Sequence, residues 1–128
     1  MNFYNMFKLQ NEFPNIELFK KHFPVTDRTI FAWDDTIYCN YNLPPDLIIH
    51  EQVHLKQQEK YGLDVWLEKY IDDEEFRLKM ELQAYRKQLN SIKDREKRNG
   101  VRIRVSRDLG SALYNNIISF KEAFDKLN

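Results

Sequence analysis

Two histidines four residues apart, with a glutamate directly after the first, lie in the stretch Ile48-Ile49-His50-Glu51-Gln52-Val53-His54-Leu55. In a helix, residues i and i+4 lie one turn apart on the same face, so His50 and His54 can share one ion. Neutral imidazole nitrogens bind zinc at about 2.0–2.1 Å. Glu51 cannot point at the same spot as both histidines, so it is better placed to reach a zinc-bound water, as a general base. The pattern predicts a catalytic zinc site.

A later segment supplies a candidate third ligand. Asp72 followed by Glu75 resembles a capping box and predicts a long helix that reaches about residue 93. Glu81 falls inside the apolar stripe of this helix, which consists of Leu78, Leu82, Tyr85, Leu89 and Ile92. An ionised carboxylate on a buried face is costly unless it is paired or bound to a metal, so Glu81 is predicted to bind the ion. The alternatives are an ion pair with a buried Arg or Lys, or a position at the edge of the stripe.

Glu74 and Glu75 are weaker candidates for the third ligand. Both fall in the first turn of the predicted long helix. Acidic residues are expected there because they interact favourably with the helix dipole and with the free amides of the helix start.

The segments before the histidine pair predict a helix and a β-hairpin. Residues 16–23 form a short amphipathic run that stops at Pro24. Residues 29–33 and 36–41 are rich in β-branched and aromatic side chains and are separated by Asp34 and Asp35, which favours a hairpin. Residues 46–61 contain no Pro or Gly and predict the helix that carries both histidines, ending near Gly62.

The remaining segments complete the predicted fold. Residues 63–71 predict a short amphipathic helix, and the charged run 93–100 is interpreted as a solvated helix end and turn. Residues 101–105 alternate like a short exposed strand. One or two closing helices are predicted from Leu113, Ile117, Phe120, Phe124 and Leu127. The predicted fold class is α+β: one small domain over residues 1–128, mostly helical, with a β-hairpin before the metal-binding helix.

Composition narrows the possible functions. Twenty basic residues balance twenty acidic ones, so no net positive field favours nucleic acid or a membrane surface as a partner. No apolar run approaches the ~20 residues of a membrane span, and the N-terminus lacks the order of a signal peptide, so a cytoplasmic protein, or one carried in a virion, is expected. Cys39 is the only cysteine, so any zinc must be held by His and carboxylate.

With these motifs, the sequence resembles the gluzincin class of zinc metallopeptidases, and within it the minimal forms called minigluzincins. His50-Glu51-Gln52-Val53-His54 matches the HExxH motif of this class, and Glu81-Leu82-Gln83-Ala84 matches the Glu-x-x-Ala pattern of its glutamate helix. The resemblance covers residues 29 to 89 and implies a small zincin-like domain. It also implies that His50, His54 and Glu81 bind zinc, that Glu51 is the base, and that Ala84 lets the two helices approach.

The activity implied by this resemblance is hydrolysis of a peptide bond in a peptide or protein substrate. The zinc-bound water would lose its proton to Glu51, attack the carbonyl, and leave an oxyanion that shares the metal. His22, Tyr85 and Tyr114 are candidates for a further oxyanion donor. The strand before the metal helix, residues 36–41, would bind extended substrate by strand addition.

An alternative from another class is a structural or interaction protein, such as a component of a virus particle or other assembly, that keeps the fold without turnover. The two hypotheses differ in the consequence of Glu51→Gln. A peptidase would lose hydrolysis while retaining zinc, whereas a structural protein would be unaffected.

Overall fold

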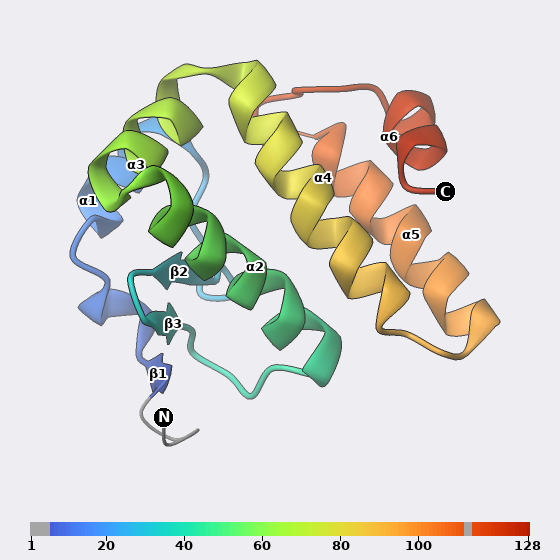
Figure 1. The fold of residues 1–128 in the computed structure, drawn as a ribbon, viewed down its shortest axis with the longest axis horizontal. Helices are drawn as coiled ribbons and strands as arrows, with labels where there is room; N and C mark the ends of the chain where they lie inside the picture. Colours follow the sequence, from blue (N-terminus) through green and yellow to red (C-terminus); the bar gives the residue numbers. More distant parts are fainter. Residues whose placement is uncertain (1–5, 112–113) are drawn as a thin grey trace.

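The computed structural model describes residues 6–111 and 114–128, which form helices around a small sheet (Figure 1). The elements in chain order are β1 (Phe7–Lys8), the short 3₁₀ helix η2 (Gln10–Glu12), α1 (Ile16–His22), β2 (Phe31–Trp33), β3 (Thr36–Tyr38), α2 (Pro45–Tyr61), α3 (Leu63–Asp72), α4 (Glu74–Asn90), α5 (Arg95–Leu109) and α6 (Phe120–Lys126). This arrangement confirms the predicted α+β class, mostly helical with a hairpin before the helix that carries the histidine pair.

The sheet has β3 at its centre. β2 and β3 form the predicted antiparallel hairpin, in which Trp33 pairs with Thr36 across a tight turn at Asp34, whose φ is 60°. β1, a two-residue strand that the sequence pattern does not indicate, pairs with β3 in parallel on the other side. The prediction that the strand at residues 36–41 binds extended substrate by strand addition is therefore wrong, because β3 is already paired with a strand on each side. Of the two strands beside it, β2 makes the more extensive contact with α2.

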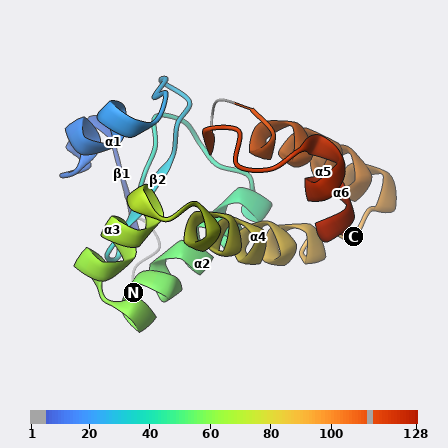
Figure 2. The same ribbon diagram turned by 90° about the horizontal axis from the view of Figure 1, so that it is seen from above.

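Helix α2 begins and ends as its sequence predicts. Pro45 and Asp46 occupy its first turn. The missing N–H of the proline costs nothing there, because the first amides of a helix have no partner within the helix. The negative charge of Asp46 interacts favourably with the helix dipole. The helix ends at Gly62, whose φ of 88° lies in the region that favours glycine. α3 then turns the chain back, and α4 runs beside α2 in roughly the opposite direction (Figures 1 and 2). The N-cap of α4 is Asp73, one residue after the predicted cap.

The prediction of a charged turn followed by an exposed strand at residues 93–105 is wrong. Asp94 caps a continuous helix, α5, through its side chain. Val101, Val105 and Leu109 are spaced four apart, lie on one face of this helix and are buried. Val101 and Val105 suggested an alternating strand because residues four apart lie on the same face in a strand and in a helix alike. Ile103, between the two valines, is 38% exposed.

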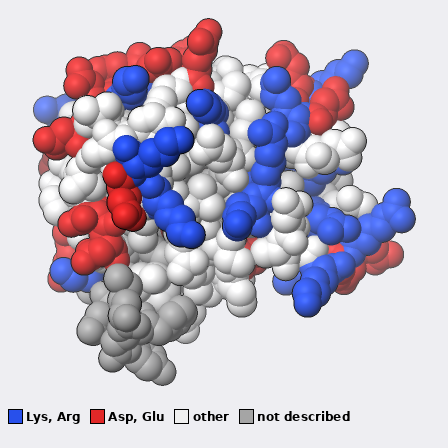
Figure 3. Space-filling view, in the orientation of Figure 1, with Lys and Arg blue, Asp and Glu red and all other residues white. Residues whose placement is uncertain are grey.

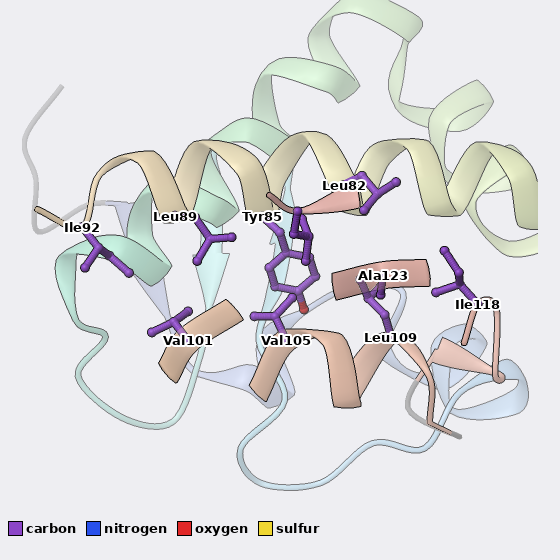
Figure 4. Packing of buried hydrophobic residues seen from close by; sticks show 10 residues of the cluster. Leu82, Tyr85, Leu89, Ile92, Val101, Val105, Leu109, Ile118 and Ala123 are labelled. Atoms are coloured by element: carbon purple, nitrogen blue, oxygen red, sulfur yellow. The ribbon is translucent and has the colours of Figure 1, made fainter. Parts of the chain in front are cut away.

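The C-terminal core lies between α4, α5 and α6. Figure 4 shows its buried side chains, which include Leu82 and Leu89 from α4, Val105 and Leu109 from α5, and Ala123 from α6. The predicted closing helix is therefore confirmed at α6, whereas Leu113 lies outside the described residues. This core covers the side of α4 that faces away from the sheet.

The sheet and α1 lie on one side of the molecule, and α5 and α6 lie on the other (Figure 2). α2 and α4 connect the two sides at the base. A buried glutamine, Gln58, fixes α2 to the sheet: its amide nitrogen donates to the carbonyl of Ala32 at 2.7 Å, and its carbonyl accepts from the backbone of Asp34 at 2.8 Å. The histidine-bearing helix is thus held in a defined position against β2.

Both signs of charge occur on the surface seen in Figure 3, where Lys and Arg over α4 and α5 are accompanied by Asp and Glu. Within the described residues, no helix has the length and apolar character needed to cross a membrane.

Candidate metal centre

His50, His54 and Glu81 meet at the interface of α2 and α4. The Nε2 atoms of the two histidines lie 3.1 Å apart, and Oε1 of Glu81 lies 3.2 Å from each of them. Three ligands at 2.0–2.1 Å from a tetrahedral ion would be separated by about 3.3 Å. All three side chains are buried, and together they form a group that could hold a metal ion. The spacing of the donor atoms and their chemical type both suit a divalent metal.

The charge state of this group depends on the carboxylate. Burial raises the pKa of Glu81, but the neighbouring His54 and His50 more than offset this and hold it well below its usual range. Burial lowers the pKa of His54, but the Glu81 carboxylate opposes this and raises it to about 9. In the metal-free protein at neutral pH, Glu81 is therefore ionised, and His54 is in its charged form, with a proton on each ring nitrogen. The proton on Nε2 occupies the place that a metal ion would take.

Glu51 lies beside the three candidate ligands without joining them. Its Oε2 is 3.8 Å from Nε2 of His50, longer than the separations within the triad. Burial is the largest cause that raises the pKa of Glu51, and the charge of Glu81 adds to it, while His50 and His54 act in the opposite direction. Glu51 also lines the cavity described below. Its position suits a group that exchanges a proton with a molecule in that cavity.

Gln88, Gln57 and Tyr70 form hydrogen bonds to the triad, and none of them was among the predicted site residues. Nδ1 of His50 is 3.0 Å from Oε1 of Gln88, and Nδ1 of His54 is 2.9 Å from Oε1 of Gln57. The hydroxyl of Tyr70 donates to Oε2 of Glu81. The available sequence signal was weak: Gln57 follows His54 by three residues and Gln88 follows Glu81 by seven, which places each on the same helix face as its neighbour.

A cavity of about 670 Å³ opens above the triad. Its lining combines the polar groups of the site with aromatic and aliphatic side chains from α1, the loop after it and β2, among them Phe19, Phe23, Val25, Ile30 and Trp33. The opposite wall includes Arg104, Val105 and Asp108 of α5, together with Tyr114. The helix that replaced the predicted strand thus forms the second wall of the cavity.

The three candidate oxyanion donors occupy different environments. The hydroxyls of Tyr85 and Tyr114 are hydrogen-bonded to each other at 2.5 Å, and both residues line the cavity. The ring of Tyr85 lies 4.3 Å from that of His50. His22 is exposed and is absent from the cavity lining. The structure therefore brings the two tyrosines to the site but not His22.

Other sequence-predicted residues lie away from the triad or in supporting positions. Glu74 and Glu75 are exposed in the first turn of α4. Cys39 is buried next to the sheet, as expected for a small apolar side chain. Ala84 is fully buried on α4, which contacts α2 closely.

Comparison of this chain with protein-family models, with curated proteins and with solved structures finds no match.

Proposed function

We propose that this protein is a zinc-dependent peptidase of the gluzincin type, with Glu51 as its general base. The observation that carries the proposal is the mutual spacing of three potential ligand atoms, two imidazole nitrogens and one carboxylate oxygen, at 3.1 Å and 3.2 Å. Two histidines and one glutamate leave a coordination position for water or substrate, as catalytic zinc sites require.

When bound, zinc supplies Lewis acidity, which makes a water acidic near neutral pH and polarises a substrate carbonyl. The proton transfers and the stabilisation of the oxyanion are assigned to residues of the chain. Glu51 takes the proton of the attacking water and delivers it to the leaving amine. One hydroxyl of the Tyr85–Tyr114 pair donates to the other, so the second retains a proton for the developing oxyanion.

The cavity supports an extended peptide or protein as the substrate. Its two walls, one from α1 and β2 and the other from α5, leave room above the triad for a chain segment with apolar side chains. Because β3 is paired on both sides, substrate would have to add at an outer strand, β1 or β2, and the Ala32 carbonyl of β2 already accepts from Gln58.

The test uses Glu51→Gln, with Glu59→Gln as the matched control on the exposed side of the same helix. Zinc content is measured by elemental mass spectrometry, and hydrolysis is measured on a library of fluorogenic peptides. Wild type and the control should bind about one zinc per chain and cleave peptides, while Glu51→Gln should bind zinc and cleave none. Zinc binding without hydrolysis by any variant would contradict the peptidase proposal and support the structural alternative.

A further inference from the structure

The orientation of the Gln57 amide is fixed by two groups that each have a single hydrogen-bonding role, the carbonyl of Met80 and the indole N–H of Trp66. Gln57 donates through Nε2 to the carbonyl of Met80 at 3.1 Å and to Oε1 of Gln83 at 3.0 Å. Its Oε1 accepts from the indole N–H of Trp66 at 3.3 Å. Reversing the amide would set two donors against each other at Trp66 and two acceptors against each other at Met80. The oxygen of Gln57 therefore faces His54.

The amide of Gln88 is fixed by a single stronger contact. Its Nε2 donates to Oδ2 of Asp46 at 2.8 Å, in a position where Gln88 is 1% exposed and Asp46 is 8% exposed. Reversal would direct the amide oxygen at a carboxylate with little solvent to separate them. The oxygen of Gln88 therefore faces His50.

An amide oxygen can only accept, so each imidazole must donate through Nδ1. A neutral imidazole that carries its proton on Nδ1 has its lone pair on Nε2. The Nε2 atoms are the ones that face each other and Glu81. The two glutamines thus select the tautomer and the ring orientation that a metal ion needs.

We propose that Gln57 and Gln88 are positioning residues that preorganise both histidines for metal binding. The inference rests on the metal site of the proposed function. Together with the hydroxyl of Tyr70 on Glu81, they give all three ligands uncharged supporting groups, which add no charge of their own to the site. The carboxylate of Asp46 does not contact the histidine; it accepts from the amide of Gln88 and so orients that amide toward His50.

The experiment measures zinc affinity by competition with a chromogenic chelator and records the visible spectrum of the cobalt-substituted protein. Gln57→Met and Gln88→Met keep the length of the side chain but remove the acceptor. Each should weaken zinc binding about 10–100-fold and alter the cobalt d–d band. Circular dichroism establishes that each variant is folded.

Gln58→Met is the matched control. Gln58 is the neighbour of Gln57 on α2 and is also buried. Its amide forms hydrogen bonds through both its nitrogen and its oxygen, but the partners are Ala32 and Asp34 rather than a histidine. This substitution should lower thermal stability while leaving zinc affinity and the cobalt spectrum unchanged. A general loosening of α2 would instead weaken zinc binding in both Gln57→Met and Gln58→Met.

A charge-swapped pair separates positioning from packing. Gln88→Glu alone sets two carboxylates face to face and should weaken zinc binding. In Asp46→Asn/Gln88→Glu, the amide and the carboxylate exchange places, so His50 regains an acceptor and zinc affinity should recover. Recovery would support the proposal whether or not the protein hydrolyses peptides. Wild-type affinity in both methionine variants, a failure of the swap to restore binding, or a wild type that binds no zinc would overturn it.

Discussion

The hydroxyl of Tyr70 donates to Oε2 of Glu81, while Oε1 of the same carboxylate faces both histidines. The two oxygens thus have separate partners. Burial raises the pKa of Tyr70 well above its ordinary value, so the phenol remains protonated and remains a donor. The carboxylate is held in an orientation in which one oxygen is available for a metal ion.

Tyr70→Phe should destabilise the metal-free protein because it leaves a buried carboxylate oxygen without its donor. The expected loss in the free energy of unfolding is about 1–3 kcal/mol, measured by urea denaturation in the presence of a chelator. Tyr61→Phe is the control, since the hydroxyl of Tyr61 makes no hydrogen bond to any described residue. Equal effects of the two substitutions would show that the Tyr70 hydroxyl does not support Glu81.

Zinc affinity should rise with pH up to about 9, because the proton on His54 competes with the metal and the pKa of His54 is raised to about 9. Below that value the apparent affinity should change about tenfold per pH unit, and above it the affinity should level off. Isothermal titration in buffers of different ionisation enthalpy would count the proton released. Zinc binding with no proton release at pH 7.5 would contradict this assignment.

The stability of the metal-free protein should show the opposite dependence. The pKa of His54 is raised from the ordinary 6.5 to about 9 in the folded state, so the ion pair with Glu81 stabilises the fold fully below pH 6.5. This contribution is lost as the pH rises through 9. The urea midpoint should therefore be lower at pH 9.5 than at pH 6.5, and Glu81→Gln should reduce the difference. An unchanged midpoint in wild type would refute the coupling.

His50, His54 and Glu81 were predictable because the spacing of residues within a helix determines which side chains share a face. His50 and His54 share a face in any helix, and Glu81 stood out as a carboxylate within an apolar stripe. The hairpin followed from two β-rich runs around Asp34 and Asp35. These are local signals, and they placed the elements that carry the triad.

The rest of the site depends on contacts between distant parts of the chain. Gln88 meets Asp46 and His50 only because α2 and α4 pack side by side, and its spacing of seven from Glu81 indicates a shared helix face but not these partners. β1 is only Phe7–Lys8, too short for a period to be recognised. α5 was missed because Val101 and Val105 are compatible with both periods until their burial partners are known.

The assignment of α5 can be tested by truncating one buried and one exposed side chain. Leu109 is fully buried against α4 and α6, so Leu109→Ala should lower the free energy of unfolding by about 2–5 kcal/mol. Ile103 lies on the opposite face, and Ile103→Ala should change it by no more than about 0.5 kcal/mol. In the helix, successive amides of residues 101–105 are hydrogen-bonded and should exchange slowly with solvent. Rapid exchange of these amides would instead indicate an exposed strand.

Tyr114→Phe should lower kcat without removing zinc, because it deletes one hydroxyl of the Tyr85–Tyr114 pair, and the ring of Tyr85 packs against that of His50. In wild type the pair holds two hydroxyl protons and uses one between them, so one is free to meet the substrate oxygen. After the substitution, Tyr85 has no partner oxygen at Tyr114 and its hydroxyl is free to rotate away from the reacting carbonyl. A loss of about 10²-fold in kcat is expected if the pair binds the oxyanion. The zinc content of the same samples separates this outcome from damage to the metal site, and an unchanged kcat would exclude Tyr114 from the reaction.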